Sequence, residues 1–114
     1  MSSEYQHIRF QVDDRVARIT FARPPLNVFN IEMMREITAA LGESARREIV
    51  AIVFSADKDC RAFSAGVAIE EHVQETIYQM LDSFHAIFRQ LEQIGKPVIA
   101  RACTATTTMT NVSN

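Results

Sequence analysis

The feature that most constrains the fold is an unbroken apolar run, Ile-Val-Ala-Ile-Val-Phe, at residues 49–54. A strand with one face in water alternates apolar and polar side chains, whereas an unbroken run is typical of a strand covered on both faces in a parallel sheet. Neighbouring parallel strands need a crossover connection, which is usually a helix. The run therefore predicts an α/β fold in which a helix precedes this strand.

The residues at the start of the chain predict a hairpin. Apolar and polar side chains alternate over residues 5–12 and again over 17–21, on either side of Asp-Asp-Arg at 13–15. Two such runs around an Asp-rich turn predict a β-hairpin with one face in water. The hairpin is predicted to end at residues 23–26 (Arg-Pro-Pro-Leu), because consecutive prolines remove two ladder donors.

Two amphipathic helices are predicted from apolar residues at helical spacing. The first covers residues 31–41 and somewhat beyond, with Asn30 as its N-cap and two arginines at 46–47 to complement its C-terminal dipole. The second covers residues 73–94 and stops at Gly95, which is followed closely by a proline. Together with the apolar run, the first helix predicts a βαβ unit.

Composition excludes several classes of function. The chain has 114 residues, with 12 basic and 14 acidic side chains and a formal net charge of −2. That balance supplies no basic field for nucleic acid or an anionic membrane, and no apolar run approaches the ~18 residues of a bilayer span. The first residues lack the basic start and the apolar stretch of a signal peptide. We therefore expect a cytoplasmic protein that binds neither nucleic acid nor membrane.

Glycine is scarce, with three residues, Gly42, Gly66 and Gly95. Average usage of about 7% would give about eight in a chain of this length. Neither G-x-G-x-x-G nor G-x-x-x-x-G-K-[ST] is present, so nucleotide binding by those glycine-rich loops is excluded.

The sharpest local feature is Phe-Ser-Ala-Gly-Val at residues 63–67, which is predicted to follow a buried strand and to enter a helix. In an open α/β sheet, ligands bind beyond the carboxyl ends of the strands, and a helix N-terminus presents unpaired N–H groups to negative charge. Small Ala65 and Gly66 would let the backbone approach a ligand. On the residues alone, an ordinary strand-to-helix turn also explains the segment.

Other candidate chemistries have weaker support. Ser64 lacks the glycines of the G-x-S-x-G nucleophile elbow, and no histidine or acid is tied to it by spacing. Asp82 and His85 lie three residues apart on the second helix, but no further histidine or cysteine cluster completes a coordination sphere. We therefore expect neither a serine nucleophile nor a metal site.

Several segments occur in an order that matches one known family. They are the hairpin, Pro-Pro-Leu-Asn-Val-Phe-Asn at 24–30, the apolar run, Ala-Phe-Ser-Ala-Gly-Val at 62–67 and Gly-Lys-Pro-Val-Ile-Ala at 95–100. In this order they resemble the crotonase family, the enoyl-CoA hydratases and isomerases. The resemblance implies the truncated N-terminal portion of a crotonase-type α/β fold, a spiral of ββα units. Within the family, residues 63–72 are most similar to the cyclohexadiene-carbonyl-CoA hydratases of anaerobic benzoyl-CoA breakdown.

The resemblance implies an acyl-CoA thioester substrate and an enolate-like transition state. CoA is then part of the substrate, and no separate cofactor is expected. Charge accumulates on the thioester oxygen, where two backbone N–H groups are needed, and the family pattern assigns the first of them to Val67. The residues implied to line the substrate and CoA path are Leu26, Val28, Ala65, Gly66, Val67, Ala68 and Ile69. Ala68 stands where an Asp is common in the family.

The last residues depart from the family pattern. Members of the family continue from Lys-Pro-Val-Ile-Ala into a glycine-rich turn, which supplies the second N–H donor, and into segments that supply the catalytic glutamates. Residues 101–114 hold no glycine and no acid, and they show neither helical nor strand periodicity. We therefore predict two parts, residues 1–100 as the N-terminal part of a crotonase-like domain and residues 101–114 as a disordered Thr-rich tail.

The function predicted from these residues is that of a fragment of an acyl-CoA hydratase, a lyase that adds water to a conjugated enoyl- or dienoyl-CoA thioester. By itself the chain is expected to be inactive, because the second donor and the glutamates are missing. Two alternatives stay open: a generic β-oxidation enoyl-CoA hydratase or isomerase, and a non-catalytic module that binds CoA or pairs with a partner chain. Full-length relatives form homo-oligomers, but no oligomer is expected of this chain.

Overall fold

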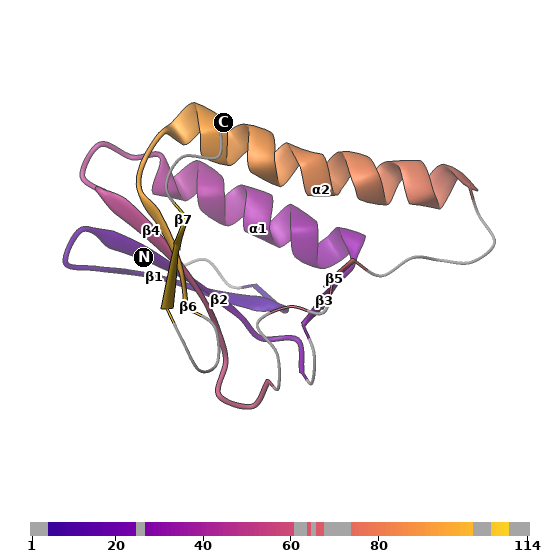
Figure 1. Ribbon diagram of the computed structural model, residues 1–114, viewed down its shortest axis with the longest axis horizontal. Helices are drawn as coiled ribbons and strands as arrows, with labels where there is room; N and C mark the ends of the chain where they lie inside the picture. The colour runs from indigo at the N-terminus through magenta and orange to yellow at the C-terminus, as the bar shows by residue number, and fades with distance from the viewer. Residues whose placement is uncertain are drawn as a thin grey trace.

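The computed structural model describes residues 5–24, 27–60, 64, 66–67, 74–101 and 106–109. Its elements, in chain order, are β1 (Ile8–Asp13), β2 (Val16–Phe21), β3 (Val28–Phe29), α1 (Ile31–Ser44), β4 (Ala51–Ala56), β5 (Gly66–Val67), α2 (Gln74–Ile94), β6 (Val98–Arg101) and β7 (Thr106–Met109). Five strands form one sheet in the order β1-β2-β4-β6-β7, and β3 and β5 form a separate pair. Both helices lie side by side over one face of the larger sheet (Figure 1).

The predicted hairpin is confirmed. β1 and β2 pair antiparallel, with Asp13 opposite Val16 across the turn. The two turn residues, Asp14 and Arg15, have φ of 53° and 67°. Two consecutive positive φ values are the mark of a type I′ turn, whose twist matches that of the strands it joins.

The predicted βαβ unit is also confirmed. β2 and β4 are parallel neighbours, with Val16 opposite Ala51, and α1 is the crossover between them. The strand begins at Ala51, two residues later than the apolar run suggests. The Ile49 N–H donates to the Arg46 carbonyl at 3.1 Å, and the Val50 N–H donates to the Arg15 carbonyl at 2.8 Å. The ladder between β2 and β4 starts at Ala51.

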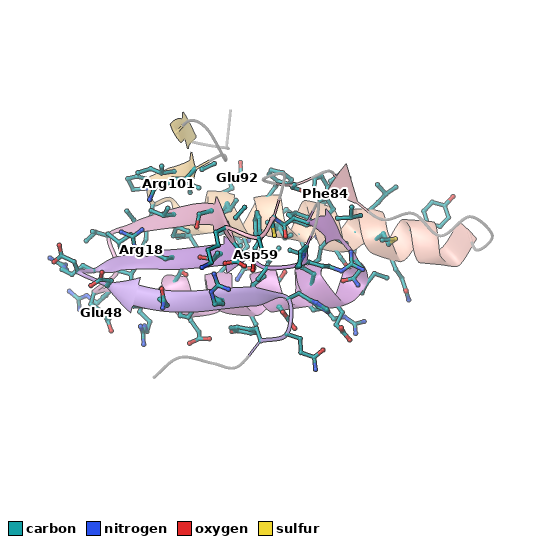
Figure 2. The ribbon with its side chains drawn as sticks, turned by 90° about the horizontal axis from the view of Figure 1, so that it is seen from below. Arg18, Glu48, Asp59, Phe84, Glu92 and Arg101 are labelled. Atoms are coloured by element: carbon teal, nitrogen blue, oxygen red, sulfur yellow. The ribbon has the colours of Figure 1, made fainter. Side chains whose placement is uncertain are left out.

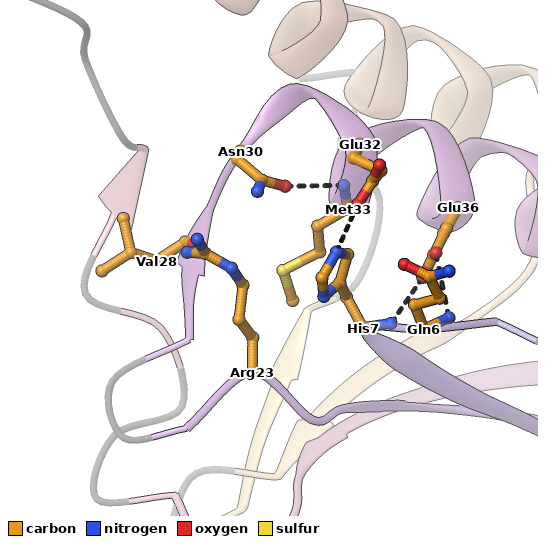
Figure 3. Close-up of polar contacts among 8 residues, drawn as sticks. All are labelled: Gln6, His7, Arg23, Val28, Asn30, Glu32, Met33 and Glu36. Atoms are coloured by element: carbon orange, nitrogen blue, oxygen red, sulfur yellow. Dashed lines mark hydrogen bonds and ion pairs between the residues drawn. The ribbon is translucent and has the colours of Figure 1, made fainter.

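The N-terminus of α1 is capped as predicted, but its C-terminus is not. The Asn30 side chain accepts a hydrogen bond from the Met33 N–H at 2.8 Å (Figure 3). The helix ends at Ser44, so the two arginines at 46–47 follow it rather than occupying its last turn. Lys96 takes the role expected of them, since its Nζ donates to the carbonyl oxygens of Ser44 at 2.8 Å and Arg46 at 2.6 Å. The cation thus comes from the residue after Gly95, far away in the sequence.

The segment that precedes β1 is held against α1 by carboxylates (Figure 3). Glu36 accepts hydrogen bonds from the N–H groups of Gln6 at 3.0 Å and His7 at 2.8 Å. The His7 Nε2 lies 2.7 Å from an oxygen of Glu32. These contacts fix the direction in which the chain enters the sheet.

The predicted stop of the second helix is confirmed. Gly95 has φ of +68°, and its N–H donates to the Leu91 carbonyl at 3.1 Å. A residue in this left-handed conformation ends a helix by bonding back to a free carbonyl in its last turn. β6 then follows and pairs parallel with β4, with Ile52 opposite Val98.

The hydrophobic core lies between the larger sheet and the two helices. Its largest apolar side chains with less than 2% exposure are Ile19, Met33, Met34, Ile37, Leu41, Ile49 and Ile52. The opposite face of the sheet carries polar side chains, among them Arg18 and Arg101 (Figure 2). The sheet is therefore covered by helices on one face only in the described part of the chain.

The structure differs from the sequence prediction in the Thr-rich tail. Thr106–Met109 form β7, which pairs antiparallel with β6, so that Thr106 lies opposite Arg101. These four residues were predicted to have no regular structure. Strands favour β-branched residues such as threonine, and the free side of β6 offers a ladder to pair with. Residues 102–105 and 110–114 lie outside the described residues, and the domain boundary at residue 100 stays a prediction.

Candidate functional site

The candidate site is built around the short pair of strands β3 and β5. These strands are parallel, with Val28 opposite Gly66 and Phe29 opposite Val67. The pair brings together Val28 from the proline-containing loop and Gly66 and Val67 from the Ala-Gly-Val segment. The family resemblance implies that both segments line the same path, and the structure places them side by side (Figure 1). Their role in binding stays a prediction, and Leu26, Ala65, Ala68 and Ile69 lie outside the described residues.

The backbone around Gly66 differs from the expected strand-to-helix turn. Gly66–Val67 are a strand, and the described part of α2 begins at Gln74. Pairing with β3 requires extended backbone, so these two residues do not form the first turn of a helix. The N–H of Val67 therefore belongs to a strand, and a helix N-terminus contributes no described N–H group at this point.

A polar cluster lies before both strands, and we define the Asn27 cluster as Asn27, Cys60 and Ser64, of which the first two are buried and Ser64 is half-buried. Asn27 is 0% exposed. Its side-chain Oδ1 accepts hydrogen bonds from the Arg23 N–H at 2.8 Å and from the Cys60 thiol at 3.3 Å. Its carbonyl oxygen accepts from the Ser64 hydroxyl at 3.0 Å. The cluster thus joins the loop that leads into β3 to the loop that leads into β5.

Sequence reasoning missed Asn27 as a member of the site. Its φ of +53° lies in the left-handed region, which costs most side chains energy but is tolerated by asparagine. Its N–H also donates to the Arg23 carbonyl at 2.9 Å, closing a turn over the prolines. An asparagine that follows Pro-Pro-Leu is typical of such a turn, so the signal was present in the sequence.

Ser64 acts through its hydroxyl as a hydrogen-bond donor to backbone. The bond to the Asn27 carbonyl directs the hydroxyl hydrogen toward an acceptor that cannot take a proton. This bond gives the residue a structural role beside β5, and the absence of a serine nucleophile stays a prediction.

An aromatic group supports β3 from the core side. The rings of Phe21 and Phe29 meet edge to face, with centroids 5.0 Å apart. Phe21 also stacks on Phe54, with centroids 5.6 Å apart. Phe29 thereby anchors a two-residue strand to the ends of β2 and β4.

One ion pair lies at the start of the loop that leads to β5. The Arg9 guanidinium donates to the Asp57 carboxylate, and this hydrogen bond holds the pKa of Asp57 below its usual range. The same residue binds through its backbone, since the Asp57 N–H donates to the Phe21 carbonyl at 2.8 Å and its carbonyl accepts from the Cys60 N–H at 2.9 Å. The loop is therefore fixed to β1 and β2 before it reaches Cys60.

Metal ligands do not gather in the described part of the chain. No group of three or more His, Cys, Asp or Glu side chains among the described residues could hold a metal ion. Asp82 lies 3.7 Å from Arg89 in an ion pair.

Neither described helix combines the length and the apolar character that a bilayer span requires.

The sequence of the chain matches a family model described as enoyl-CoA hydratase/isomerase over residues 11–105. The chain belongs to the enoyl-CoA hydratase/isomerase family. The match begins within β1, runs past the end of β6 and includes both strands of the candidate site. The family resemblance inferred from the sequence motifs is therefore confirmed.

One curated relative of this family member is the cyclohexa-1,5-dienecarbonyl-CoA hydratase of Thauera aromatica. The two sequences are 29% identical over 87 residues, which cover 76% of this chain and 33% of that protein. The chain thus spans about a third of the length of the curated relative that it matches.

Solved structures confirm the predicted fold class. DspI of Pseudomonas aeruginosa is similar with a TM-score of 0.78 and 19% identity, over 88% of this chain and 39% of that one. An enoyl-CoA hydratase of Mycobacterium smegmatis is similar with a TM-score of 0.75 and 24% identity, over 84% of this chain and 39% of that one. The chain therefore has the crotonase-type α/β fold over a portion that corresponds to about two fifths of these structures.

Proposed function

We propose that this family member carries the part of an acyl-CoA hydratase that binds the thioester and CoA. One observation carries the proposal most directly: β3 and β5 place Val28 opposite Gly66. Two segments that the family pattern assigns to the same ligand path are thus adjacent in the fold. The path is proposed to be lined by Leu26, Val28, Ala65, Gly66, Val67, Ala68 and Ile69.

The chemistry that this part contributes is stabilisation of an oxyanion. When water adds to a double bond conjugated with a thioester, negative charge develops on the thioester oxygen. The Val67 N–H is proposed to donate to that oxygen, and a backbone donor needs no reorientation during the reaction. The absence of a side chain at Gly66 leaves room for the ligand beside this N–H.

The proposed substrate class is a conjugated cyclic dienoyl-CoA thioester. The similarity to the Thauera aromatica protein supports this choice, because that relative is named for a cyclohexadiene substrate. A linear enoyl-CoA of β-oxidation is the competing substrate, and a direct comparison of affinities separates the two.

We further propose that the 114-residue chain binds its ligand but hydrates it very slowly. Loss of one oxyanion donor costs about 10²–10³ in rate. Each missing acid or base costs a further ~10²–10⁴. The chain is also proposed to act as a cytoplasmic monomer without metal or cofactor. Sedimentation velocity of the purified protein tests the monomeric state, and metal analysis tests the absence of metal.

Titration calorimetry with three probes tests the proposal: cyclohexa-1,5-diene-carbonyl-CoA, crotonyl-CoA and free CoA. We expect measurable affinity for both thioesters, with the cyclic one bound more tightly, and no binding by a Gly66→Leu variant. Gly42→Ala is the matched control, because Gly42 lies in α1 and its substitution should leave binding unchanged. A folded wild-type chain that binds none of the three probes would disprove the proposal, and rapid hydration would disprove the expected inactivity.

A further inference from the structure

We propose that the Asn27 cluster is the positioning device of the thioester site, and that Ser64 sets the place of the Val67 N–H through it. This inference rests on the proposed function, because it concerns the strand pair that carries the proposed donor. The three residues touch no substrate in this proposal. They act by holding the backbone that does.

The strand pair is too short to be rigid by itself. β3 and β5 contain two residues each, and strands in proteins usually contain five or six. So short a ladder has too few hydrogen bonds to fix its own position. Its geometry must be imposed by the residues next to it.

The bonds of the cluster lie next to the strand pair. Ser64 is two residues before Gly66, and Asn27 is immediately before Val28. The Ser64 hydroxyl donates to the Asn27 carbonyl at 3.0 Å, so this bond connects the two segments at the entrance to the pair. A change in this distance shifts β5 along or away from β3.

Asn27 itself is held from several directions. Its Oδ1 accepts from the Arg23 N–H at 2.8 Å and from the Cys60 thiol at 3.3 Å. The same thiol lies 3.9 Å from the Phe21 carbonyl oxygen, at the end of β2. The carbonyl to which Ser64 donates therefore belongs to a residue that is tied to the larger sheet.

Rigidity of the backbone at β5 matters because an oxyanion donor acts over a narrow range of distances to the charged oxygen. A donor must lie about 2.7–3.1 Å from the oxygen that becomes charged. Functional groups are generally held to within about 0.5 Å of the productive geometry by the residues behind them. The Asn27 cluster supplies such support from the larger sheet to β5.

Three variants separate positioning from general stability. Ser64→Ala removes the donor, and Ser64→Thr restores a hydroxyl. Ser44→Ala is the control, because the Ser44 hydroxyl also donates to a backbone carbonyl, that of Ala40 at 2.8 Å, but is fully buried and lies within α1. Asn27→Gly is a further variant that keeps the positive φ while removing the side-chain acceptor.

The first readout is amide hydrogen exchange of the free chain by NMR. We expect Ser64→Ala to raise the exchange rate at the amides of β3 and β5 about tenfold while β4 and α1 keep their protection.

The second readout is the binding of crotonyl-CoA that carries ¹³C at its thioester carbonyl, measured as an affinity and as the infrared shift of that carbonyl. For Ser64→Ala we expect about tenfold weaker affinity, the effect of roughly one hydrogen bond. We also expect this variant to lose part of the infrared shift of the bound carbonyl.

The outcomes distinguish the inference from the proposed function. Ser64→Thr and Ser44→Ala should leave both readouts near the wild-type values, and Asn27→Gly should behave like Ser64→Ala. The inference is overturned if Ser64→Ala changes neither exchange at β5 nor the carbonyl shift, or if Ser44→Ala changes them equally. If the wild-type chain binds no thioester, the proposed function is overturned, and the exchange experiment alone then decides whether the cluster positions the strand pair.

Discussion

Two glycines outside the site should respond in opposite directions to the same substitution. Gly42 lies inside α1, where a Cβ would meet only the Gln90 Nε2 at 3.7 Å, an ordinary contact. Alanine is favoured over glycine in a helix by about 0.8–1 kcal/mol. Because Gly42 is in the last turn, we expect Gly42→Ala to stabilise the chain by about 0.5–1 kcal/mol.

Gly95→Ala makes the same atomic change with the opposite result. No atom lies within 4 Å of the position of its Cβ, so the substitution creates no clash. Its φ of +68°, however, is unfavourable for a residue with a side chain. Left-handed backbone costs such a residue about 1–2 kcal/mol, and we expect a loss of that size.

Thermal and urea denaturation measure both effects. In a domain of this size, 1 kcal/mol corresponds to roughly 3–5 °C, so the two variants should differ in Tm by about 5–15 °C. Ala39→Gly is the control, because this exposed residue of α1 should lose about what Gly42→Ala gains. A shift of both glycine variants in the same direction, with unchanged urea m-values, would refute the reasoning.

Three further predictions concern single polar contacts. Lys96→Met should cost about 1–2 kcal/mol in urea denaturation, because two carbonyls at the C-terminal end of α1 and just beyond it lose a charged donor; no loss would show that water replaces the lysine at no cost. Asn30→Ala should cost about 1 kcal/mol through loss of the bond to the first turn of α1, whereas Asn30→Ser should cost little, and equal losses would contradict a capping role. Arg9 lowers the pKa of Asp57, so the pair should stabilise the chain fully above roughly pH 4 and lose this contribution as the pH falls further. Asp57→Asn should therefore flatten the acid side of the plot of Tm against pH, and an unchanged acid side would exclude the pair as its cause.

Elements that depend on their own residues could be predicted from the sequence. The hairpin turns where charged residues interrupt two alternating runs, and its turn closes between Asp13 and Val16 as the pattern indicates. Asn30 caps α1 because the acceptor and the donor it serves are three residues apart. In each case the interacting groups are neighbours in the chain, so periodicity and residue type are sufficient.

Contacts between distant segments were predicted less well. The arginines at 46–47 are correctly placed in the sequence to serve the end of α1, but Lys96 reaches its carbonyls instead. Its position depends on how α2 packs beside α1, which no local pattern contains. β7 was missed for the same reason, because its pairing depends on the free side of β6 rather than on alternation in its own residues.

The candidate site combines both kinds of information. Its Ala-Gly-Val segment and its proline-containing loop were recognised as motifs, and the motif order was enough to predict the enoyl-CoA hydratase/isomerase family. The parallel register of Val28 with Gly66 could not be read from either motif. It depends on how α1 and β4, which lie between the two segments in the sequence, pack in the fold.

By itself, the sequence determined the α/β class, the hairpin, the two helices and the family, because these follow from periodicity, capping and turn residues within short stretches. Only the tertiary structure decided that Asn27, Cys60 and Ser64 meet, and that β5 is a strand rather than the start of a helix. The physical reason is that a buried polar group forms hydrogen bonds with the partners that tertiary packing places beside it. Which partner that is depends on the whole fold.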